Sequence, residues 1–288
     1  MCVIKINKLI LLFIFNLLLS SFCFAQTGFQ LNSRQVQTQL ITEVPSIAPG
    51  QPFWVGLHMK IVPGWHTYWK NPGDSGQPTR IKWTLPEGFS AGPLEWPYPR
   101  RYPVGTFVNF GYENEVLLLT KITPPSQLEA GQEAKISARA NWLVCRDICI
   151  PEDATMSVSI PIGKAPVAPQ SPWKELFSVA KAELPGTLTH WDVSAEWVET
   201  VTIIKLKPKS SQPIKLDNVV FFPDQEGAIE NAEPQVLTTD NNVYQLMIKN
   251  APQSPPSKVL QGVLVSAQGW GGKQPKAVQV NIPVKVKK

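Results

Sequence analysis

Short runs in which apolar and polar residues alternate recur along most of the chain, and turn-forming residues separate them. A period of two is typical of β-strands with one buried face, whereas helices need apolar residues three or four positions apart. One series of such runs lies at 36–42, 53–61, 116–122, 134–142 and 154–160. A second series lies at 201–206, 218–222, 243–248, 259–267 and 277–286. The pattern predicts an all-β protein of antiparallel strands.

A Pro-rich stretch at 161–172 separates the two series and has no hydrophobic period, as expected of a stiff linker. We therefore expect one β-sandwich over 29–165, a linker over 166–171 and a second sandwich-like domain over 172–288. We expect an immunoglobulin-like topology for both. One short helix should follow the linker and end before Pro185.

The segment 63–111 departs from this pattern. It is dense in Trp, Tyr, Pro and Gly, and it predicts a long loop. Long loops are uncommon in compact domains and are usually functional, so we expect this segment to contribute to function.

The first 25 residues have the features of a secretory signal peptide. Lys5 and Lys8 give a positive start, the apolar run 9–19 is too short to cross a membrane, and small residues at 23 and 25 offer a cleavage site. No later stretch is long and apolar enough to span a bilayer. We expect an exported protein that is soluble once residues 1–25 are removed.

The charge balance argues against a nucleic-acid partner. The chain has 27 Lys and Arg against 22 Asp and Glu, and without Lys5 and Lys8 the balance is 25 against 22. Such a weakly basic chain without Lys/Arg runs does not predict nucleic-acid binding. A phosphate-binding Gly loop and a Ser-His-Asp arrangement are also not evident, which disfavours nucleotide enzymes and hydrolases.

Two of the four cysteines, Cys2 and Cys23, leave with the predicted signal peptide, so Cys145 and Cys149 remain. Exported compartments are oxidising, and two remaining cysteines are therefore expected to be paired or to cycle. The loop that they would close has about five residues, which limits its stabilising effect.

Three interpretations of this pair stay open at this point. A redox pair needs an accessible sulfur, a thiolate and a second sulfur, and Arg146 would favour the thiolate while Asp147 would oppose it. A Cu(I) site would use Cys145 and Cys149, with His66 as the first candidate for a third ligand. A structural disulfide in a binding module is the third interpretation. Two cysteines are too few for structural zinc.

Three passages of the chain form a recognisable combination: GWHTYWKNPGDSGQPT, FVNFGYENEVLLLTKI and NWLVCRDICIPE. In this order they resemble the amino-terminal periplasmic domain of the DsbD family of thiol:disulfide interchange proteins. The ScsB-like branch, linked to suppression of copper sensitivity, is the most similar. The resemblance covers about residues 30–165, and the second half resembles the remaining periplasmic region of that branch less specifically.

This resemblance implies an immunoglobulin-like periplasmic domain that carries out exchange of the protein-disulfide reductase type. Its cysteine pair passes electrons to thioredoxin-fold periplasmic proteins. Cys149 would form the mixed disulfide with a partner and Cys145 would resolve it. No cofactor is implied, with Cu(I) as the alternative. Longer relatives continue into a membrane domain and a thioredoxin-like domain. We therefore expect a membrane electron-transfer protein to supply electrons in trans, the alternative being a truncated derivative whose cysteine pair has another electron donor.

The family also has an aromatic cap loop that shields the pair until a partner docks. By order along the chain the loop corresponds to 107–111, with Phe107 and Phe110 as candidate lids. The expected surroundings of the pair are Asn109, Tyr112, Glu113 and Asp147.

Overall fold

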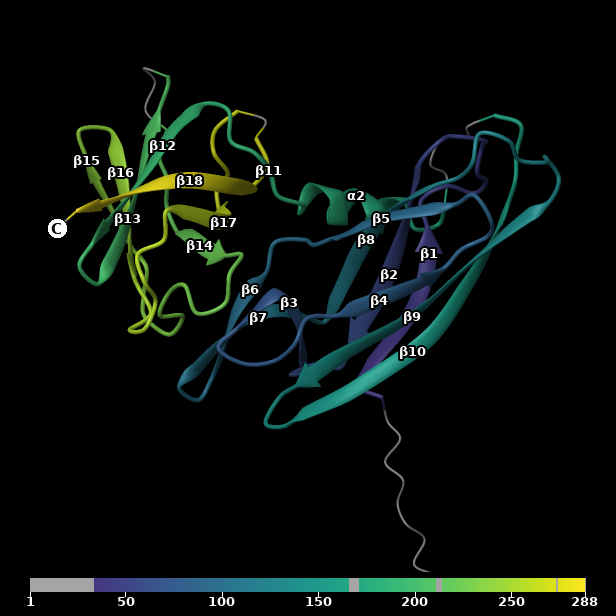
Figure 1. The fold of residues 1–288 in the computed structure, drawn as a ribbon, viewed down its shortest axis with the longest axis horizontal. Helices are drawn as coiled ribbons and strands as arrows, with labels where there is room; N and C mark the ends of the chain where they lie inside the picture. The colour runs from purple at the N-terminus through teal and green to yellow at the C-terminus, as the bar shows by residue number, and fades with distance from the viewer. Residues whose placement is uncertain (1–33, 166–170, 211–213, 273, 288) are drawn as a thin grey trace, which may run out of the picture. The chain divides into compact units, whose positions relative to one another are not determined.

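The computed structural model describes residues 34–165, 171–210, 214–272 and 274–287 (Figure 1). Nearly all regular structure in these ranges is β, and one α-helix, α2 (Lys174–Ala182), is present. The predicted all-β fold is confirmed. The predicted signal peptide and residues 166–170 of the predicted linker lie outside the described residues. No helix in the described ranges is long and apolar enough to span a membrane.

The first sandwich has one sheet with the strand order β1-β2-β8-β5. Its strands are β1 (Val36–Thr42), β2 (Phe53–Ile61), β8 (Glu115–Thr123) and β5 (Ser90–Glu95). All neighbours are antiparallel. The apolar side chains at alternate positions, such as Val55, Leu57 and Leu118, face the core between the two sheets.

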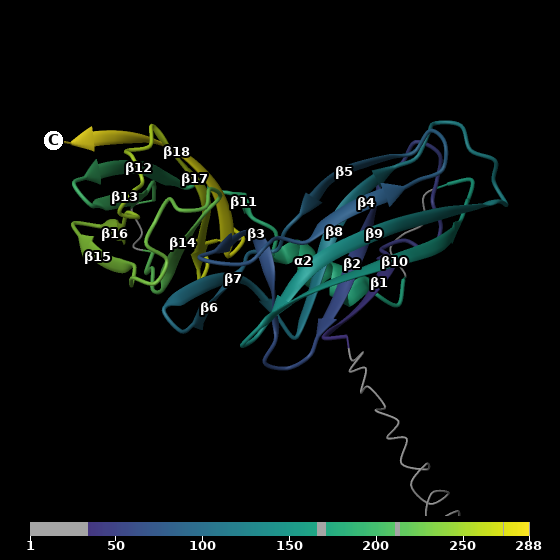
Figure 2. The same cartoon turned by 60° about the horizontal axis from the view of Figure 1, so that its bottom comes forward.

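The facing sheet has the order β10-β9-β3-β7-β6, and β4 pairs with β9 beside it. Its strands are β10 (Cys149–Pro161), β9 (Glu133–Cys145), β3 (His66–Gly73), β7 (Phe107–Glu113), β6 (Arg100–Val104) and β4 (Arg80–Thr84). β9 and β10 form a long hairpin, paired from Cys145↔Cys149 to Glu133↔Pro161 (Figure 2). This hairpin carries both cysteines at one end of the sheet.

The prediction of a long loop over 63–111 is wrong, because β3 to β6 and most of β7 lie in this segment. Two irregularities obscure the alternation in the sequence. The register shifts between Tyr68 and Gly73 in β3, and again between Ala91 and Leu94 in β5. Bulges of this kind interrupt the period of two, and pairing with regular neighbours such as β8 holds the irregular strands in place.

Helix α2 covers the outer face of the β1-β2-β8-β5 sheet. Phe177 and Ala180 of the helix pack with Ile41, Leu117 and Leu119 in a separate apolar cluster. The sequence predicted this helix. The Ser171 hydroxyl accepts a hydrogen bond from the Trp173 amide, which lies just before the first helical residue, and from no amide within the helix. The sandwich therefore buries both faces of this sheet.

The second set of strands has the order β14-β17-β18-β12-β13-β16-β15. Its elements are β11 (Gly186–Thr187), β12 (Trp191–Val198), β13 (Val201–Pro208), β14 (Val219–Pro223), β15 (Val236–Asp240), β16 (Val243–Lys249), β17 (Val259–Ser266) and β18 (Ala277–Lys287). β18 pairs with β17 up to Pro283 and with β12 from Val284, so one strand joins two sheets. A core that includes Trp191 and Trp270 lies among these strands.

The division into two domains stays a prediction. The core cluster of the first sandwich also contains Phe222, Val263 and Ala277 from the second set of strands. Residues from Arg34 onward form one compact unit.

Candidate functional site

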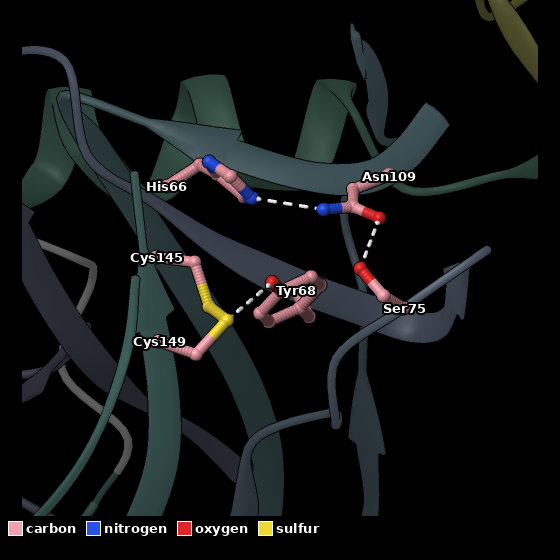
Figure 3. Close-up of a disulfide and its surroundings, with 6 residues drawn as sticks. All are labelled: His66, Tyr68, Ser75, Asn109, Cys145 and Cys149. Atoms are coloured by element: carbon pink, nitrogen blue, oxygen red, sulfur yellow. Dashed lines mark hydrogen bonds between the residues drawn. A yellow bond between two sulfur atoms is a disulfide. The ribbon is translucent and has the colours of Figure 1, made fainter. Parts of the chain in front are cut away.

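The cysteines form a disulfide across the end of the β9–β10 hairpin (Figure 3). Cys145 is the last residue of β9, Cys149 is the first of β10, and the two are directly paired with their Cα atoms 4.2 Å apart. The Arg146 amide donates to the Ile148 carbonyl at 3.1 Å and closes the turn. The long ladder behind this turn therefore holds the two sulfurs within bonding distance.

The two cysteines differ strongly in exposure. Cys145 is 2% exposed, because β3 pairs with its strand at His66↔Cys145 on the side away from β10. Cys149 is exposed, since it begins the edge strand β10, and Ile148 before it is 66% exposed. A second protein can therefore reach Cys149 but not Cys145.

Tyr68 of β3 points its hydroxyl at the exposed cysteine, with 3.5 Å between Tyr68 Oη and Cys149 Sγ (Figure 3). Burial raises the pKa of Tyr68 to about 12, and a side-chain hydrogen bond with Ser75 lowers it only in part. The phenol is thus protonated at neutral pH and can donate to a thiolate at Cys149. A Cβ on Gly76, where φ is +108°, would lie 2.2 Å from the Tyr68 ring, so this position requires glycine.

A hydrogen-bonded chain of three side chains lies beside Tyr68. Ser75 Oγ donates to Asn109 Oδ1 at 2.9 Å, and Asn109 Nδ2 lies 3.3 Å from His66 Nε2. Because the serine fixes the amide, Asn109 donates to Nε2 and the histidine carries its proton on Nδ1. Burial lowers the pKa of His66 and keeps the ring neutral. The ring also stacks on Tyr102, with 5.4 Å between centroids.

Arg146 and Asp147, which the sequence placed in opposition, form an ion pair of 2.9 Å. Both side chains are exposed, and the guanidinium lies 5.2 Å from the centroid of the Trp65 ring. Two opposite charges that lie next to each other at the surface largely cancel, so neither residue dominates the electrostatic potential at the sulfurs. The contact with Trp65 instead holds the turn against the β2–β3 connection.

The two candidate lids lie in different surroundings. Phe107, at the start of β7, is 53% exposed, whereas Phe110 is 1% exposed and packs its ring on Phe222 at 5.1 Å. The structure therefore places one of the two rings at the surface and the other in the core. The role of either residue in capping stays a prediction.

The remaining predicted surroundings are spread along the same sheet. Asn109 is 1% exposed and joins the chain described above. The Tyr112 hydroxyl donates to the Pro97 carbonyl at 2.6 Å, and Glu113 is paired in register with His66. Of this set, Asn109 is thus the residue that the structure joins directly to the hydrogen-bonded chain.

Tyr68 and Ser75 were not among the site residues predicted from the sequence. The pattern His66-Thr67-Tyr68 places positions 66 and 68 on the same face of a strand, which was a usable signal. The neighbour of that strand was not visible in the sequence, because the pairing of β3 with β7 and β9 is a long-range feature.

The described residues contain no group of three or more His, Cys, Asp or Glu side chains that could hold a metal ion. His66 Nε2, the predicted extra copper ligand, accepts a hydrogen bond from Asn109. The copper interpretation stays a prediction.

Residues 36–160 match the family model described as "Thiol:disulfide interchange protein DsbD, N-terminal". Over these residues the chain is similar to DsbD amino-terminal domains. The predicted resemblance is confirmed, and the matched segment contains both cysteines of the disulfide. The match to this family together with the disulfide supports a role in thiol–disulfide interchange.

A solved structure has a similar fold. The N-terminal periplasmic domain of ScsB from Proteus mirabilis is similar over 88% of this chain and 95% of its own, with a TM-score of 0.60 and 17% identity. At this identity the likeness shows the fold. Spo0M, a sporulation control protein from Bacillus subtilis, covers 87% of this chain and 91% of its own at 12% identity, with a TM-score of 0.23. No curated protein matches the chain in sequence.

Proposed function

We propose that the protein exchanges thiols and disulfides in the periplasm and passes reducing equivalents to thioredoxin-fold proteins through Cys145 and Cys149. The main support for this proposal is the difference in exposure within the disulfide. Another protein can reach the sulfur of Cys149, whereas the sulfur of Cys145 is buried. Exchange needs an accessible sulfur that bonds to the partner and a second sulfur that later breaks that bond. We therefore assign the first role to Cys149 and the second to Cys145.

The transfer begins with both cysteines reduced. The Cys149 thiolate attacks one sulfur of the partner's disulfide, and the other partner sulfur leaves as a thiolate with the bonding electron pair. Cys145 then loses its proton and attacks Cys149 Sγ, and the partner's first sulfur leaves in turn. The partner gains two electrons and two protons, and the Cys145–Cys149 disulfide forms.

Tyr68 supports the first step of this reaction. A thiolate is the reactive form of cysteine, and a hydrogen bond to it lowers the thiol pKa. The Tyr68 hydroxyl is already directed at Cys149 Sγ, so it requires no large rearrangement. We assign Tyr68 the role of stabilising the Cys149 thiolate.

The partners follow from the family. DsbD amino-terminal domains interact with thioredoxin-fold proteins, and we propose the same class as electron acceptors here. For the supply of electrons we propose a membrane electron-transfer protein acting in trans.

A purely structural role for the disulfide is less well supported. The bond closes a loop of about five residues, for which loop entropy gives about 2 kcal/mol. The β9–β10 ladder already joins the same two strands over their full length. A purely structural disulfide would also not require an exposed Cys149 sulfur next to the Tyr68 hydroxyl.

Single-cysteine variants test the proposal. Cys145→Ala should trap a disulfide-linked thioredoxin-fold partner through Cys149, because no second sulfur can release it. Cys149→Ala is the matched control and should trap little, since Cys145 is buried. The proposal fails if neither variant traps a partner, and the assignment of roles fails if Cys149→Ala traps as much as Cys145→Ala.

A further inference from the structure

The second set of strands contacts the disulfide-bearing sheet at the irregular part of β3. The register of β3 shifts between Tyr68 and Gly73, and the residues between them are not paired with β7. Asn71, which is 1% exposed, donates from Nδ2 to the carbonyls of Pro223 at 2.8 Å and Gln225 at 3.2 Å. Its Oδ1 accepts from the Gly73 amide at 2.9 Å. Asn71 therefore ties the shape of this bulge to the end of β14.

Asp74 makes a second contact directly after the bulge. Its Oδ2 accepts a hydrogen bond from the Val108 amide of β7 at 2.7 Å. Its Oδ1 accepts from Asn231 Nδ2, also at 2.7 Å. Because a carboxylate can only accept, this contact fixes the orientation of the Asn231 amide. The Asp74 side chain thus joins β7 to the second set of strands.

Asn231 lies in the connection between β14 and β15 and is itself held from two sides. The amide of Glu230 donates to the Lys249 carbonyl of β16 at 2.9 Å, which ties the connection to its own sheet. Arg101 of β6 donates to the Asn231 carbonyl and, at 3.3 Å, to the Glu233 carbonyl. Asn231 is 5% exposed. It is therefore a fixed donor rather than a mobile surface amide.

Asp74 begins the turn that packs on Tyr68. The next residue, Ser75, makes a side-chain hydrogen bond with Tyr68, and Gly76 lies against the tyrosine ring (Figure 3). The Tyr68 hydroxyl lies 3.5 Å from Cys149 Sγ. Hydrogen bonds weaken steeply as their geometry worsens, so a small displacement of this turn would weaken the contact with the sulfur.

We propose that the second set of strands positions the exchange site by holding Asp74 through Asn231. This contact keeps the Tyr68 hydroxyl directed at Cys149 Sγ. Asp74 and Asn231 are positioning residues, since they act through Tyr68 rather than on the sulfurs. The inference rests on the proposed exchange function and on the role of Tyr68 in it. It gives the second set of strands a part in the chemistry of exchange.

The test measures the pKa of the Cys149 thiol in the Cys145→Ala variant of the full chain, from the rate of alkylation against pH. Asn231→Ala should raise this pKa by about half a unit, because the hydrogen bond to the thiolate is weakened. Lys70→Ala is the matched control. It breaks another contact between β3 and the second set, the ion pair with Asp224 at 2.7 Å, and should leave the thiol pKa unchanged.

A double-mutant cycle shows whether Asn231 acts through Tyr68. Tyr68→Phe should raise the thiol pKa by about one unit on its own. Asn231→Ala added to Tyr68→Phe should then cause no further rise, since residues that act through one contact are not additive. An equal rise with and without the tyrosine hydroxyl would contradict the proposal.

A reciprocal exchange of side chains provides a rescue. Asn231→Asp places a second carboxylate opposite Asp74 and should raise the thiol pKa at least as much as Asn231→Ala. The double variant Asp74→Asn/Asn231→Asp should return it to the native value. An amide at position 74 can donate to the carboxylate at 231 and still accept from the Val108 amide. A pKa that stays raised in the double variant would contradict the proposal.

The outcomes separate this inference from the exchange function. If Tyr68→Phe raises the thiol pKa and Asn231→Ala does not, the positioning role is wrong and the exchange function stands. If Tyr68→Phe has no effect either, the role of Tyr68 and the positioning role are both wrong. Trapping of a partner by Cys145→Ala decides the exchange function itself and does not depend on Asn231.

Discussion

The aromatic centre of the second set of strands and the surroundings of the disulfide satisfy their polar side chains in different ways. In the aromatic centre the acceptors are backbone carbonyls: Trp191 Nε1 donates to the Trp270 carbonyl at 2.9 Å and Trp270 Nε1 to the Lys276 carbonyl at 3.0 Å. Beside the disulfide, Ser75, Asn109 and His66 bond to one another, and Tyr68 contacts a sulfur.

This difference distinguishes a region that stabilises the fold from a region that is suited to thiol chemistry. A backbone carbonyl does not titrate and is present whatever the sequence, so the aromatic centre of the second set of strands specifies structure. A chain of side chains depends on every member and contains groups that hold or donate protons. We therefore expect changes in the second centre to affect stability, and changes around Tyr68 to affect exchange.

The largest expected effect is on stability and comes from Trp270→Ala. Trp270 is fully buried and packs edge-on against Trp191 at 5.8 Å. Its removal should lower the free energy of unfolding by about 3–5 kcal/mol in a urea titration. The rate of exchange of the folded variant should equal that of the native protein. A changed exchange rate would show that the two regions do not affect stability and exchange independently.

Removing the disulfide should have a smaller effect on stability. The Cys145→Ala/Cys149→Ala double variant should lose about 2 kcal/mol, as the short closed loop implies. The measurement is the same urea titration, with the oxidised protein as reference. A loss above about 4 kcal/mol, more than this loop can supply, would favour a structural disulfide over a redox pair.

Tyr68→Phe should slow exchange and leave the fold intact. Loss of a hydrogen bond to a charged group should raise the pKa of the Cys149 thiol by about one unit. A more basic thiolate is also a better nucleophile, so the net slowing at neutral pH should be about three-fold. The rate of alkylation of the Cys145→Ala variant against pH gives the pKa directly. Tyr102→Phe, which alters a ring stacked on His66, is the control and should not move it.

The smallest expected effect is on the pH dependence of the free energy of unfolding. Burial lowers the folded-state pKa of His66 below its ordinary value of 6.5. Just below pH 6.5 the unfolded chain therefore binds more protons at this histidine than the folded chain does. The stabilisation that comes from burying the neutral ring is complete above pH 6.5 and is lost as the pH falls. In His66→Gln the free energy of unfolding should fall less between pH 7.5 and pH 5 than in the native protein. Identical pH dependence of the two proteins would contradict a buried, neutral histidine.

The regular strands were predictable from the sequence because their alternation is uninterrupted. The runs 36–42 and 53–61 coincide with β1 and β2. The strands around the cysteines are longer than predicted, since β9 and β10 extend to Cys145 and Cys149. There the ladder continues through residues whose local pattern is weak, such as Pro151.

The candidate site was predictable only in part. The cysteine pair is visible from its spacing, and the family resemblance assigns its roles. The exposure difference between Cys145 and Cys149 is not visible, because it depends on β3 covering one cysteine and on β10 being an edge strand. The position of Tyr68 likewise depends on tertiary contacts with a turn that contains Gly76.

The most direct test of the central claim identifies which sulfur of the native disulfide an incoming thiol attacks. The oxidised protein is mixed with a single-cysteine peptide thiol, quenched early with acid, alkylated and digested, and the mixed disulfide is located by mass spectrometry. The account predicts the peptide on Cys149 and the alkylating group on Cys145. A peptide found mainly on Cys145, or equally on both cysteines, would contradict it.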